Sequence, residues 1–277
     1  DVGELVFTRK FTLYENIATV GVSASRSRNT KNMGEEQTVQ FLVNYSQLQI
    51  NNPSQEIHVA ILKNENWKTA ITKIQPQFYK PNQLVYKYPK KTNFWGGNEY
   101  LFFDNKNIRN ASVNIAKSER KEIYHNYLYP YVNRGLKSYT YNPDINGQFI
   151  IRNIEATNPK TEADYAMMYF SLKVGQEIVD KEVYVYGAFN NFSLTEENKM
   201  IFDPSTNYYH ANFLLKQGFY NYTFVTKSWD TIISESEIRG NFSETENMYT
   251  VIVYHKGFGA LFDRVIGVGS IQFKGER

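Results

Sequence analysis

The residues that could do chemistry are scattered along this chain rather than grouped. Covalent catalysis needs a nucleophile with a general base beside it, and the 277 residues include no cysteine and no Gly-x-Ser-x-Gly turn. The four histidines stand alone: His58 and His255 lie within predicted strands, and His125 and His210 lie beside tyrosines. No two of them have the spacing of a zinc site. We therefore expect these histidines to serve packing or the surface.

Acidic and glycine-rich segments lead to the same expectation. Residues 142–147 resemble the start of a calcium loop, but Asn153 stands where the bidentate glutamate is required. Glu35/Glu36 and Glu196/Glu197 are neighbours in polar turns, so they point apart and cannot share one bond as glycosidase acids do. Gly257-Phe258-Gly259 is not followed by a helix start, as a phosphate loop requires. The sequence thus predicts a protein that is not an enzyme, with no metal and no cofactor.

The elements that would position any site are strands. Aromatic residues make up 16% of the chain, with 22 Tyr and 19 Phe, and these residues favour half-buried pleated surfaces. Residues 213–225 predict two strands around a Gln217-Gly218 turn, because Tyr220, Tyr222 and Phe224 fall on one face at a period of two. Residues 183–186 predict a partner strand. No long segment has the helical period, so we expect an all-β protein with few helices.

The chain is long enough for about two domains. Short predicted strands fill residues 17–174, including a hairpin at Asn146-Gly147, which is a strong turn signal. Residues 174–181 are charged, contain a glycine and predict a linker. Residues 182–273 predict six or seven strands at the spacing of a sandwich. We therefore expect two β-sandwich domains of Ig-like or early-set-like type in tandem, preceded by a lone strand at residues 5–15.

Charge and composition exclude some classes of protein. The net charge of +3 is too weak to indicate nucleic-acid binding, and the short basic clusters indicate solvated surface. No segment approaches the ~20 apolar residues of a membrane-spanning helix. The absence of cysteine leaves the compartment open, and the start at Asp1 suggests a processed or truncated product.

Two segments near the C-terminus resemble the glycogen- and starch-binding Ig-like module. They are Val-Tyr-Gly-Ala-Phe-Asn-Asn-Phe-Ser at residues 185–193 and Leu-Lys-Gln-Gly-Phe-Tyr-Asn-Tyr-Thr-Phe-Val at residues 215–225. That family stacks tryptophans on sugar faces, whereas Phe192 stands at the first stacking position here. The resemblance implies an alternative function as a glycan-binding module of a bacterial envelope protein, with Phe192 and Trp229 as the platforms.

A second resemblance covers nearly the whole chain. Its motifs include Asn52-Pro53-x-x-Glu56-Ile57, Asn64-x-x-Trp67-x-x-Ala70-Ile71, Gly96-Gly97-Asn98-Glu99-Tyr100-x-Phe102-Phe103-Asp104, Asp144-x-Asn146-Gly147-x-Phe149, Ala163-Asp164-Tyr165, Gly240-Asn241-x-x-Glu244-Thr245-Glu246-Asn247-x-Tyr249 and Asp263-Arg264-x-Ile266-Gly267. Together with residues 214–222, this set resembles the type 9 secretion system plug protein family of Bacteroidota.

The plug family resemblance implies a non-enzymatic periplasmic protein that binds and seals the periplasmic opening of the outer-membrane translocon barrel. It implies association with the outer membrane through that partner, with no direct membrane insertion and no small-molecule substrate. The family has a further N-terminal domain, so residues 1–16 would be the residual last strand of that domain.

A seal of this kind needs a broad contact surface, and aromatic side chains are enriched at interfaces. Aromatic turns are therefore the candidates for partner binding, with core packing as the open alternative; they contribute Phe94, Trp95, Tyr127, Tyr129 and Tyr131.

Overall fold

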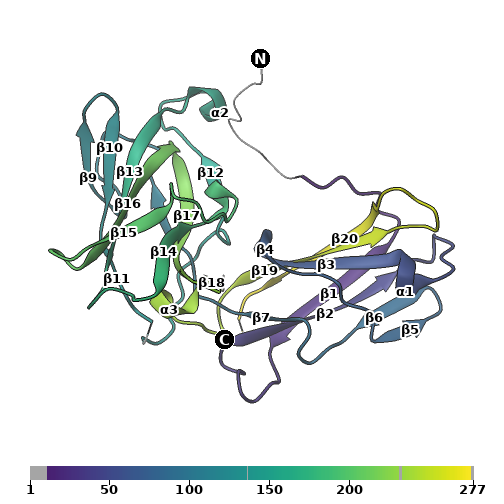
Figure 1. Ribbon diagram of the computed structural model, residues 1–277. Helices are drawn as coiled ribbons and strands as arrows, with labels where there is room; N and C mark the ends of the chain where they lie inside the picture. Colours follow the sequence, from purple (N-terminus) through teal and green to yellow (C-terminus); the bar gives the residue numbers. More distant parts are fainter. Residues whose placement is uncertain (1–10, 136, 231–232, 276–277) are drawn as a thin grey trace.

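The computed structural model describes residues 11–135, 137–230 and 233–275, and within them the protein is almost entirely β (Figure 1). The helical elements are single turns: α1 (Pro53–Glu56), α2 (Pro159–Glu162), α3 (Ser236–Arg239) and the 3-10 turn η1 (Ala188–Asn190). The prediction of a mostly β protein with few helices is confirmed. In this part of the chain no helix is long and apolar enough to cross a membrane.

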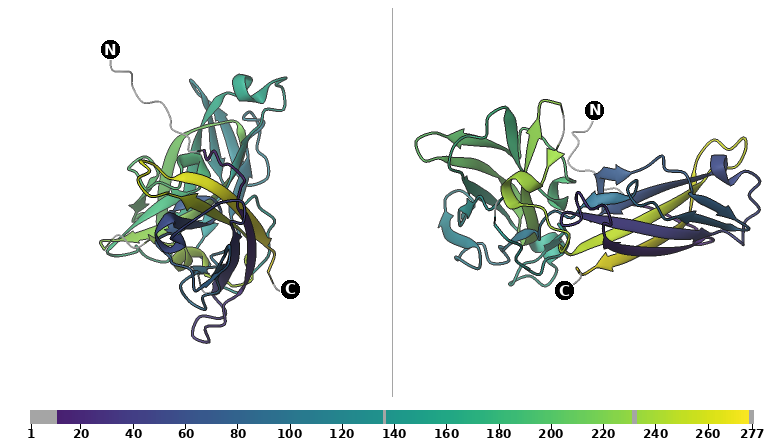
Figure 2. Two further views of the ribbon diagram at one scale, coloured as in Figure 1. Left: turned by 90° about the vertical axis from the view of Figure 1, so that its right-hand side faces the viewer. Right: turned by 90° about the horizontal axis from the view of Figure 1, so that it is seen from below.

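The strands form three sheets, arranged in two lobes that lie end to end (Figures 1 and 2). We call the first the sandwich lobe, because two sheets pack on one shared core. Its first sheet contains β1 (Thr19–Arg26), β2 (Glu36–Asn44), β5 (Phe78–Lys80), β6 (Gln83–Tyr86) and β7 (Asn93–Trp95); its second contains β3 (Ile57–Lys63), β4 (Asn66–Ile71), β19 (Asn247–His255) and β20 (Arg264–Phe273).

Alternation of side chains explains the core of the sandwich lobe. Successive residues of a strand point to opposite faces, so every second residue of β2, β3 and β19 turns inward. Val39, Phe41 and Val43 on β2 face Val251 and Val253 on β19, and all five are almost completely buried. The core therefore joins residues from the beginning and the end of the chain.

We call the second lobe the barrel lobe. It is one sheet, in which eight strands in the order β12-β17-β14-β15-β16-β13-β10-β9 curl into a nearly closed barrel, while β8, β11 and β18 pair with β17 or β13. The bounds are β8 (Leu101–Asp104), β9 (Ile115–Arg120), β10 (Tyr124–Leu128), β11 (Tyr131–Val132), β12 (Phe149–Ile151), β13 (Tyr165–Lys173), β14 (Lys181–Tyr186), β15 (Lys199–Asp203), β16 (Tyr208–Lys216), β17 (Gly218–Ser228) and β18 (Ile233–Ser234).

The interior of the barrel lobe is aromatic. Tyr220, Tyr222 and Phe224 on β17 point inward as predicted, and each is at most 5% exposed. Phe103 stacks on Tyr220 with ring centroids 5.0 Å apart, and Phe170 meets Tyr222 edge-on at 5.2 Å. Stacked and edge-on rings stabilise a core beyond the effect of area alone.

The predicted strand pairing is partly right. The strand at 183–186 does pair with β17, with Val185 opposite Phe224. However, β16 and β17 are not neighbours in the sheet, so the predicted hairpin around Gln217-Gly218 is wrong. Gln217 is instead a corner, because its backbone N–H donates to Asp164 O at 2.8 Å while its amide donates to Lys106 O at 2.9 Å.

The predicted pair of tandem sandwiches does not describe the sheets. Nine residue pairs join β13 and β16 across the predicted linker at 174–181, and β19 pairs with β3 over seven residues. The sandwich lobe thus combines residues 17–95 with residues 247–273, and the barrel lobe is inserted between them. Local composition carries no information on hydrogen bonding between strands far apart in sequence, so the charge and glycine of residues 174–181 predict a linker where the structure has a loop within one sheet.

Two further local predictions differ from the structure. Asn146 and Gly147 form a tight turn with φ of +55° and +77°, but residues 139–145 are not a strand, so there is no hairpin. Of the lone strand predicted at 5–15, residues 5–10 lie outside the described residues, and 11–15 are not a strand. Glu15 N–H donates to Val265 O at 2.9 Å, which holds this segment beside β20.

Candidate functional site: the joint and cleft between the lobes

Within the described residues the chain crosses between the lobes twice, at residues 96–100 and 240–246. The two crossings lie against each other. A side chain at Gly96 would place its Cβ 2.0 Å from the backbone oxygen of Phe242. Phe242 N–H donates to Gly97 O at 2.9 Å, and Gly97 N–H donates to the side chain of Asn241 at 2.6 Å. Glycine is therefore required where the crossings meet.

A buried amide cluster ties these crossings to the sandwich lobe. The Nδ2 of Asn247 donates to Gln37 Oε1 at 3.0 Å and to Gly96 O at 2.9 Å. The Nε2 of Gln37 donates to Ser243 O at 2.8 Å and to Thr245 O at 2.7 Å. Both amide side chains are at most 1% exposed. Such a fully bonded buried network favours one arrangement of its members.

Two carboxyl groups face the same joint, of which Glu99 is buried and Asp144 is half-buried. Glu99 is 1% exposed, and burial raises its pKa to about 7. One of its oxygens accepts from the Tyr139 hydroxyl and from Glu246 N–H, whereas Oε2 has no hydrogen-bond partner. Burial likewise raises the pKa of Asp144 to about 6, although its oxygens accept from the backbone N–H groups of Asn146 and Tyr100. Neutralising a buried acid removes the desolvation penalty of its charge.

Two buried cations complete the joint. The Nζ of Lys63 donates to Trp95 O at 3.0 Å and pairs with Glu235 at 3.2 Å. The guanidinium of Arg239 lies 5.5 Å from the centroid of the Tyr131 ring and donates to Thr223 Oγ1 at 3.3 Å. The Lys63–Glu235 pair joins the two lobes, whereas the contacts of Arg239 lie within the barrel lobe. Because this pair and the hydrogen bonds between the crossings span the joint, it is a bonded connection rather than a free linker.

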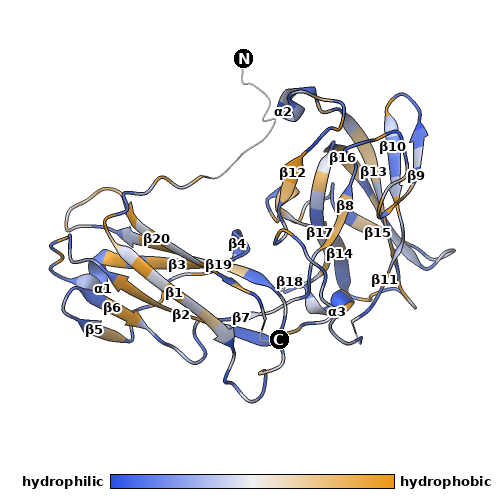
Figure 3. Ribbon diagram, turned by 180° about the vertical axis from the view of Figure 1, so that it is seen from behind, coloured by the Kyte–Doolittle hydropathy of each residue, from blue (hydrophilic) through white to orange (hydrophobic). Residues whose placement is uncertain are grey.

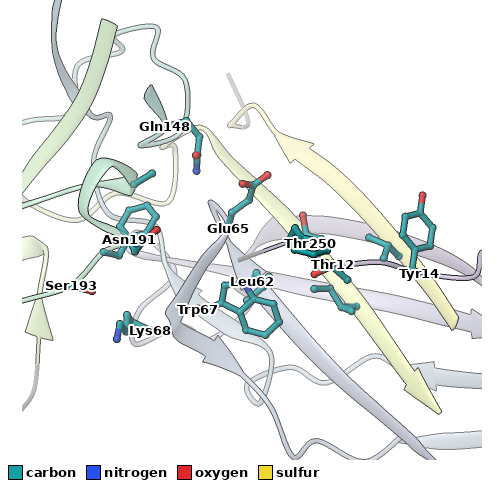
Figure 4. Close-up of a pocket in the computed structure, with 15 residues that line it drawn as sticks. Thr12, Tyr14, Leu62, Glu65, Trp67, Lys68, Gln148, Asn191, Ser193 and Thr250 are labelled. Atoms are coloured by element: carbon teal, nitrogen blue, oxygen red, sulfur yellow. The ribbon is translucent and has the colours of Figure 1, made fainter. Parts of the chain in front are cut away.

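Beside the joint lies an open cleft of about 840 Å³ between the lobes (Figure 4). Trp67 and Lys68 line it from β4, Gln148, Asn191 and Ser193 line it from the barrel lobe, and Tyr14 lines it from the N-terminal segment. Aromatic rings, amides and hydroxyls are suited to binding. Glu65 and Lys68 add one carboxylate and one amine to the lining.

The described residues contain no group of three or more His, Asp or Glu side chains able to hold a metal. The histidines are apart from one another: His58 is exposed, His125 contacts the Tyr169 hydroxyl at 2.9 Å, His210 contacts Ser171 at 3.1 Å, and His255 contacts Glu56 at 3.2 Å.

The five aromatic residues predicted for partner binding divide into packed and exposed groups. Phe94 is buried in the sandwich core against Tyr249. Tyr127 stacks on Tyr169 at 4.3 Å, and Tyr131 packs against Phe224 and Arg239. Trp95 and Tyr129 are 54% and 61% exposed, one in each lobe. Trp95 and Tyr129 are therefore the two predicted residues whose side chains are exposed enough to contact a partner.

The residues of the glycan-binding alternative are not arranged alike. Phe192 is 4% exposed and packs on Tyr186 with centroids 5.2 Å apart. Trp229 is 80% exposed. A sugar ring stacks on an open aromatic face, which Phe192 does not offer although it borders the cleft.

Sequence reasoning missed the cleft and the buried acids. In the sequence, the residues of the joint stand out only as motif positions, at 96–100, 144–147 and 240–249. One signal could have indicated a buried polar joint. It is a cluster of Gly, Asn and Glu residues that does not connect two paired strands as a turn.

Comparison with known proteins identifies the fold but no family. No protein-family model matches the chain, and no curated protein is similar. The crystal structure of a hypothetical protein from Parabacteroides merdae, a member of the Bacteroidota, is similar with a TM-score of 0.88 and 28% sequence identity. The match covers 94% of this chain and 66% of that chain, so this chain spans just under two thirds of that protein.

Proposed function

We propose that this chain is a non-enzymatic plug that binds and seals the periplasmic opening of the outer-membrane translocon barrel of the type 9 secretion system. The proposal rests on the set of motifs that resemble those of the plug family. In the structure, motif residues such as Gly96, Glu99, Asp144 and Asn247 gather at one joint. The similarity to a protein of the Bacteroidota supports the proposal, because the plug family also belongs to the Bacteroidota.

The mechanism of such a plug is steric. A folded body that closes a wide pore needs a broad, stiff surface rather than a pocket, and reversible release needs moderate affinity. The bonded joint would hold the two lobes as one wedge, so that contact by one lobe positions the other. Trp95 and Tyr129, which are exposed on different lobes, are the aromatic contacts that this proposal retains.

A pull-down from detergent-solubilised outer membranes tests the proposal. The wild-type chain is expected to retain a very large outer-membrane barrel, and a Trp95→Ala/Tyr129→Ala variant is expected to retain ~tenfold less, as for loss of interface hot spots. Trp229→Ala, another exposed aromatic residue, is the matched control. Failure of the wild-type chain to retain any such barrel refutes the function; equal retention by all three proteins refutes only the two contact residues.

The alternative, a glycan-binding module, rests on the exposed ring of Trp229. Titration of soluble glucan against tryptophan fluorescence distinguishes the two functions. A saturable response that Trp229→Ala abolishes would support glycan binding. An unchanged spectrum would mean that Trp229 does not bind glucan, and it would contradict the alternative.

A further inference from the structure

The turn between β19 and β20 exposes three large apolar side chains. We call residues 256–263 the distal loop, because it lies at the end of the sandwich lobe farthest from the barrel lobe (Figure 1). Phe258 is fully exposed, Leu261 is 94% exposed and Phe262 is 70% exposed. Single exposed apolar residues are ordinary on soluble proteins, but a contiguous group marks an interaction site.

The shape of the distal loop does not depend on burying these side chains. Lys256 N–H donates to Glu56 O at 2.8 Å, and Ala260 N–H donates to Gly257 O at 2.9 Å. His255 contacts Glu56 at 3.2 Å at the base of the loop. Gly259 has a φ of +77°, which glycine adopts at no steric cost. The backbone is thus held at its base while the apolar side chains point away from the lobe.

A second apolar feature occurs at the same end. The short edge strand β5 turns into β6 at this end of the lobe, and it exposes Phe78 by 53% and Tyr79 by 51% (Figures 1 and 2). Figure 3 shows the apolar colour of the distal loop at this end. Two separate projections therefore share one end of the molecule.

Charged residues surround these projections. Lys80 and Lys256 are exposed, Asp263 is also exposed, and Arg264 pairs with Glu15. Lys80 directly follows Tyr79, and only Gly257 separates Lys256 from Phe258. Aromatic side chains with adjacent lysines are the arrangement found where proteins meet the interface of a lipid bilayer.

We propose that the distal end of the sandwich lobe docks on a lipid bilayer, with Phe258, Leu261 and Phe262 inserted into its interfacial layer. A protein partner would need two separately placed pockets to receive the distal loop and β5. A bilayer accommodates both the distal loop and β5 without shape complementarity. Side chains that project from the surface, rather than lining a groove, are suited to insertion into a bilayer. The contact is independent of the proposed sealing function, and it departs from the expectation of no direct membrane insertion.

Flotation with protein-free vesicles tests the proposal. Wild-type protein is expected to float with vesicles of phosphatidylethanolamine and phosphatidylglycerol, and to bind vesicles of phosphatidylcholine more weakly because the lysines then lack anionic headgroups. The variant Phe258→Ser/Leu261→Ser/Phe262→Ser is expected to partition at least ~tenfold less, because membrane binding scales with buried apolar area.

A control variant removes three other well-exposed apolar side chains, all from the barrel lobe. Ile154→Ser/Val179→Ser/Ile201→Ser changes residues that are 64%, 71% and 75% exposed, and it is expected to float like the wild type. Circular dichroism of both triple variants checks that they remain folded. Equal flotation of the two triple variants overturns the proposal.

Phe258→Trp places a reporter in the distal loop. Its emission is expected to shift to shorter wavelength with vesicles and to be quenched by brominated acyl chains. Absence of quenching, or absence of wild-type flotation, overturns the proposal. Loss of outer-membrane barrel capture by the distal-loop variant without any vesicle binding also overturns it, and assigns the loop to a protein partner. Because the vesicles hold no protein, these results do not depend on whether the chain is a plug.

Discussion

The joint makes a prediction about pH, because Glu99 is a buried acid in the crossing between the lobes. Its pKa is about 7 in the folded protein, against an ordinary value of 4.5. The cause is burial, opposed by the hydrogen bonds from Tyr139 and Glu246. Since Oε2 has no partner, replacing Glu99 by glutamine removes the charge and keeps the other oxygen in place to accept those bonds.

The magnitude follows from the pKa difference. One pKa unit corresponds to about 1.4 kcal/mol, so the shift of Glu99 is of order 3 kcal/mol. The folded state holds its proton to a higher pH than the unfolded state. Stability is therefore greatest below the unfolded pKa, falls as the pH rises from about 4.5 to 7, and stays constant above 7.

Other groups face Glu99 and affect this range. Asp144, whose pKa is raised to about 6, contributes in the same direction between about 3.8 and 6. Glu246 and Asp144 both raise the pKa of Glu99 through their charge, and Arg239 lowers that of Asp144. The Glu99→Gln variant therefore retains the Asp144 part of the pH dependence and loses the Glu99 part, which spans about 4.5 to 7.

Thermal unfolding across this pH range measures the effect. At pH values above 7, Glu99→Gln is expected to melt ~6–10 °C higher than the wild type, since about 3 kcal/mol shifts Tm by that amount in a chain of this size. At acidic pH the two curves are expected to converge. Glu197→Gln makes the same chemical change at an exposed site and is expected to follow the wild type.

Two results would refute this reasoning. One is a Glu99→Gln profile parallel to that of the wild type at all pH values. The other is a variant less stable than the wild type at alkaline pH, which would mean that the charged form of Glu99 stabilises the joint. Tyr139→Phe supplies a second check: loss of its hydroxyl is expected to raise the pKa of Glu99 further and move the fall in stability to higher pH.

Three further predictions concern packing and buried polarity. Gly96→Ala is expected to lower Tm strongly, because a Cβ would lie 2.0 Å from a backbone oxygen of the other crossing, whereas Gly21→Ala, with no atom within 4 Å, should be nearly neutral in the same melt. Gln37→Met is expected to lower the free energy of unfolding in urea by about 3 kcal/mol, since it leaves buried donors and acceptors unpaired; an unchanged urea midpoint would contradict the role of the amide cluster. Phe103→Ala is expected to destabilise by about 3–5 kcal/mol in the same titration, and Phe258→Ala, at a fully exposed position, by almost nothing.

Local patterns in the sequence determined the secondary structure well. The alternation of Tyr220, Tyr222 and Phe224 predicted both a strand and its buried face, and all three side chains are buried. Period-two burial depends on near neighbours in the chain, so it can be read locally.

Tertiary structure alone decided which strands meet. Pairing of β19 with β3 joins residues about two hundred positions apart, and no local signal distinguishes that pairing from one within a C-terminal domain. The same long-range contacts bring Gly96 against Phe242 and bury Glu99 beside Glu246. The motif residues could therefore be identified from the sequence, but their role in joining two lobes could not. Burial of a carboxyl or an amide group depends on every segment that packs around it, and these segments are far apart in the sequence.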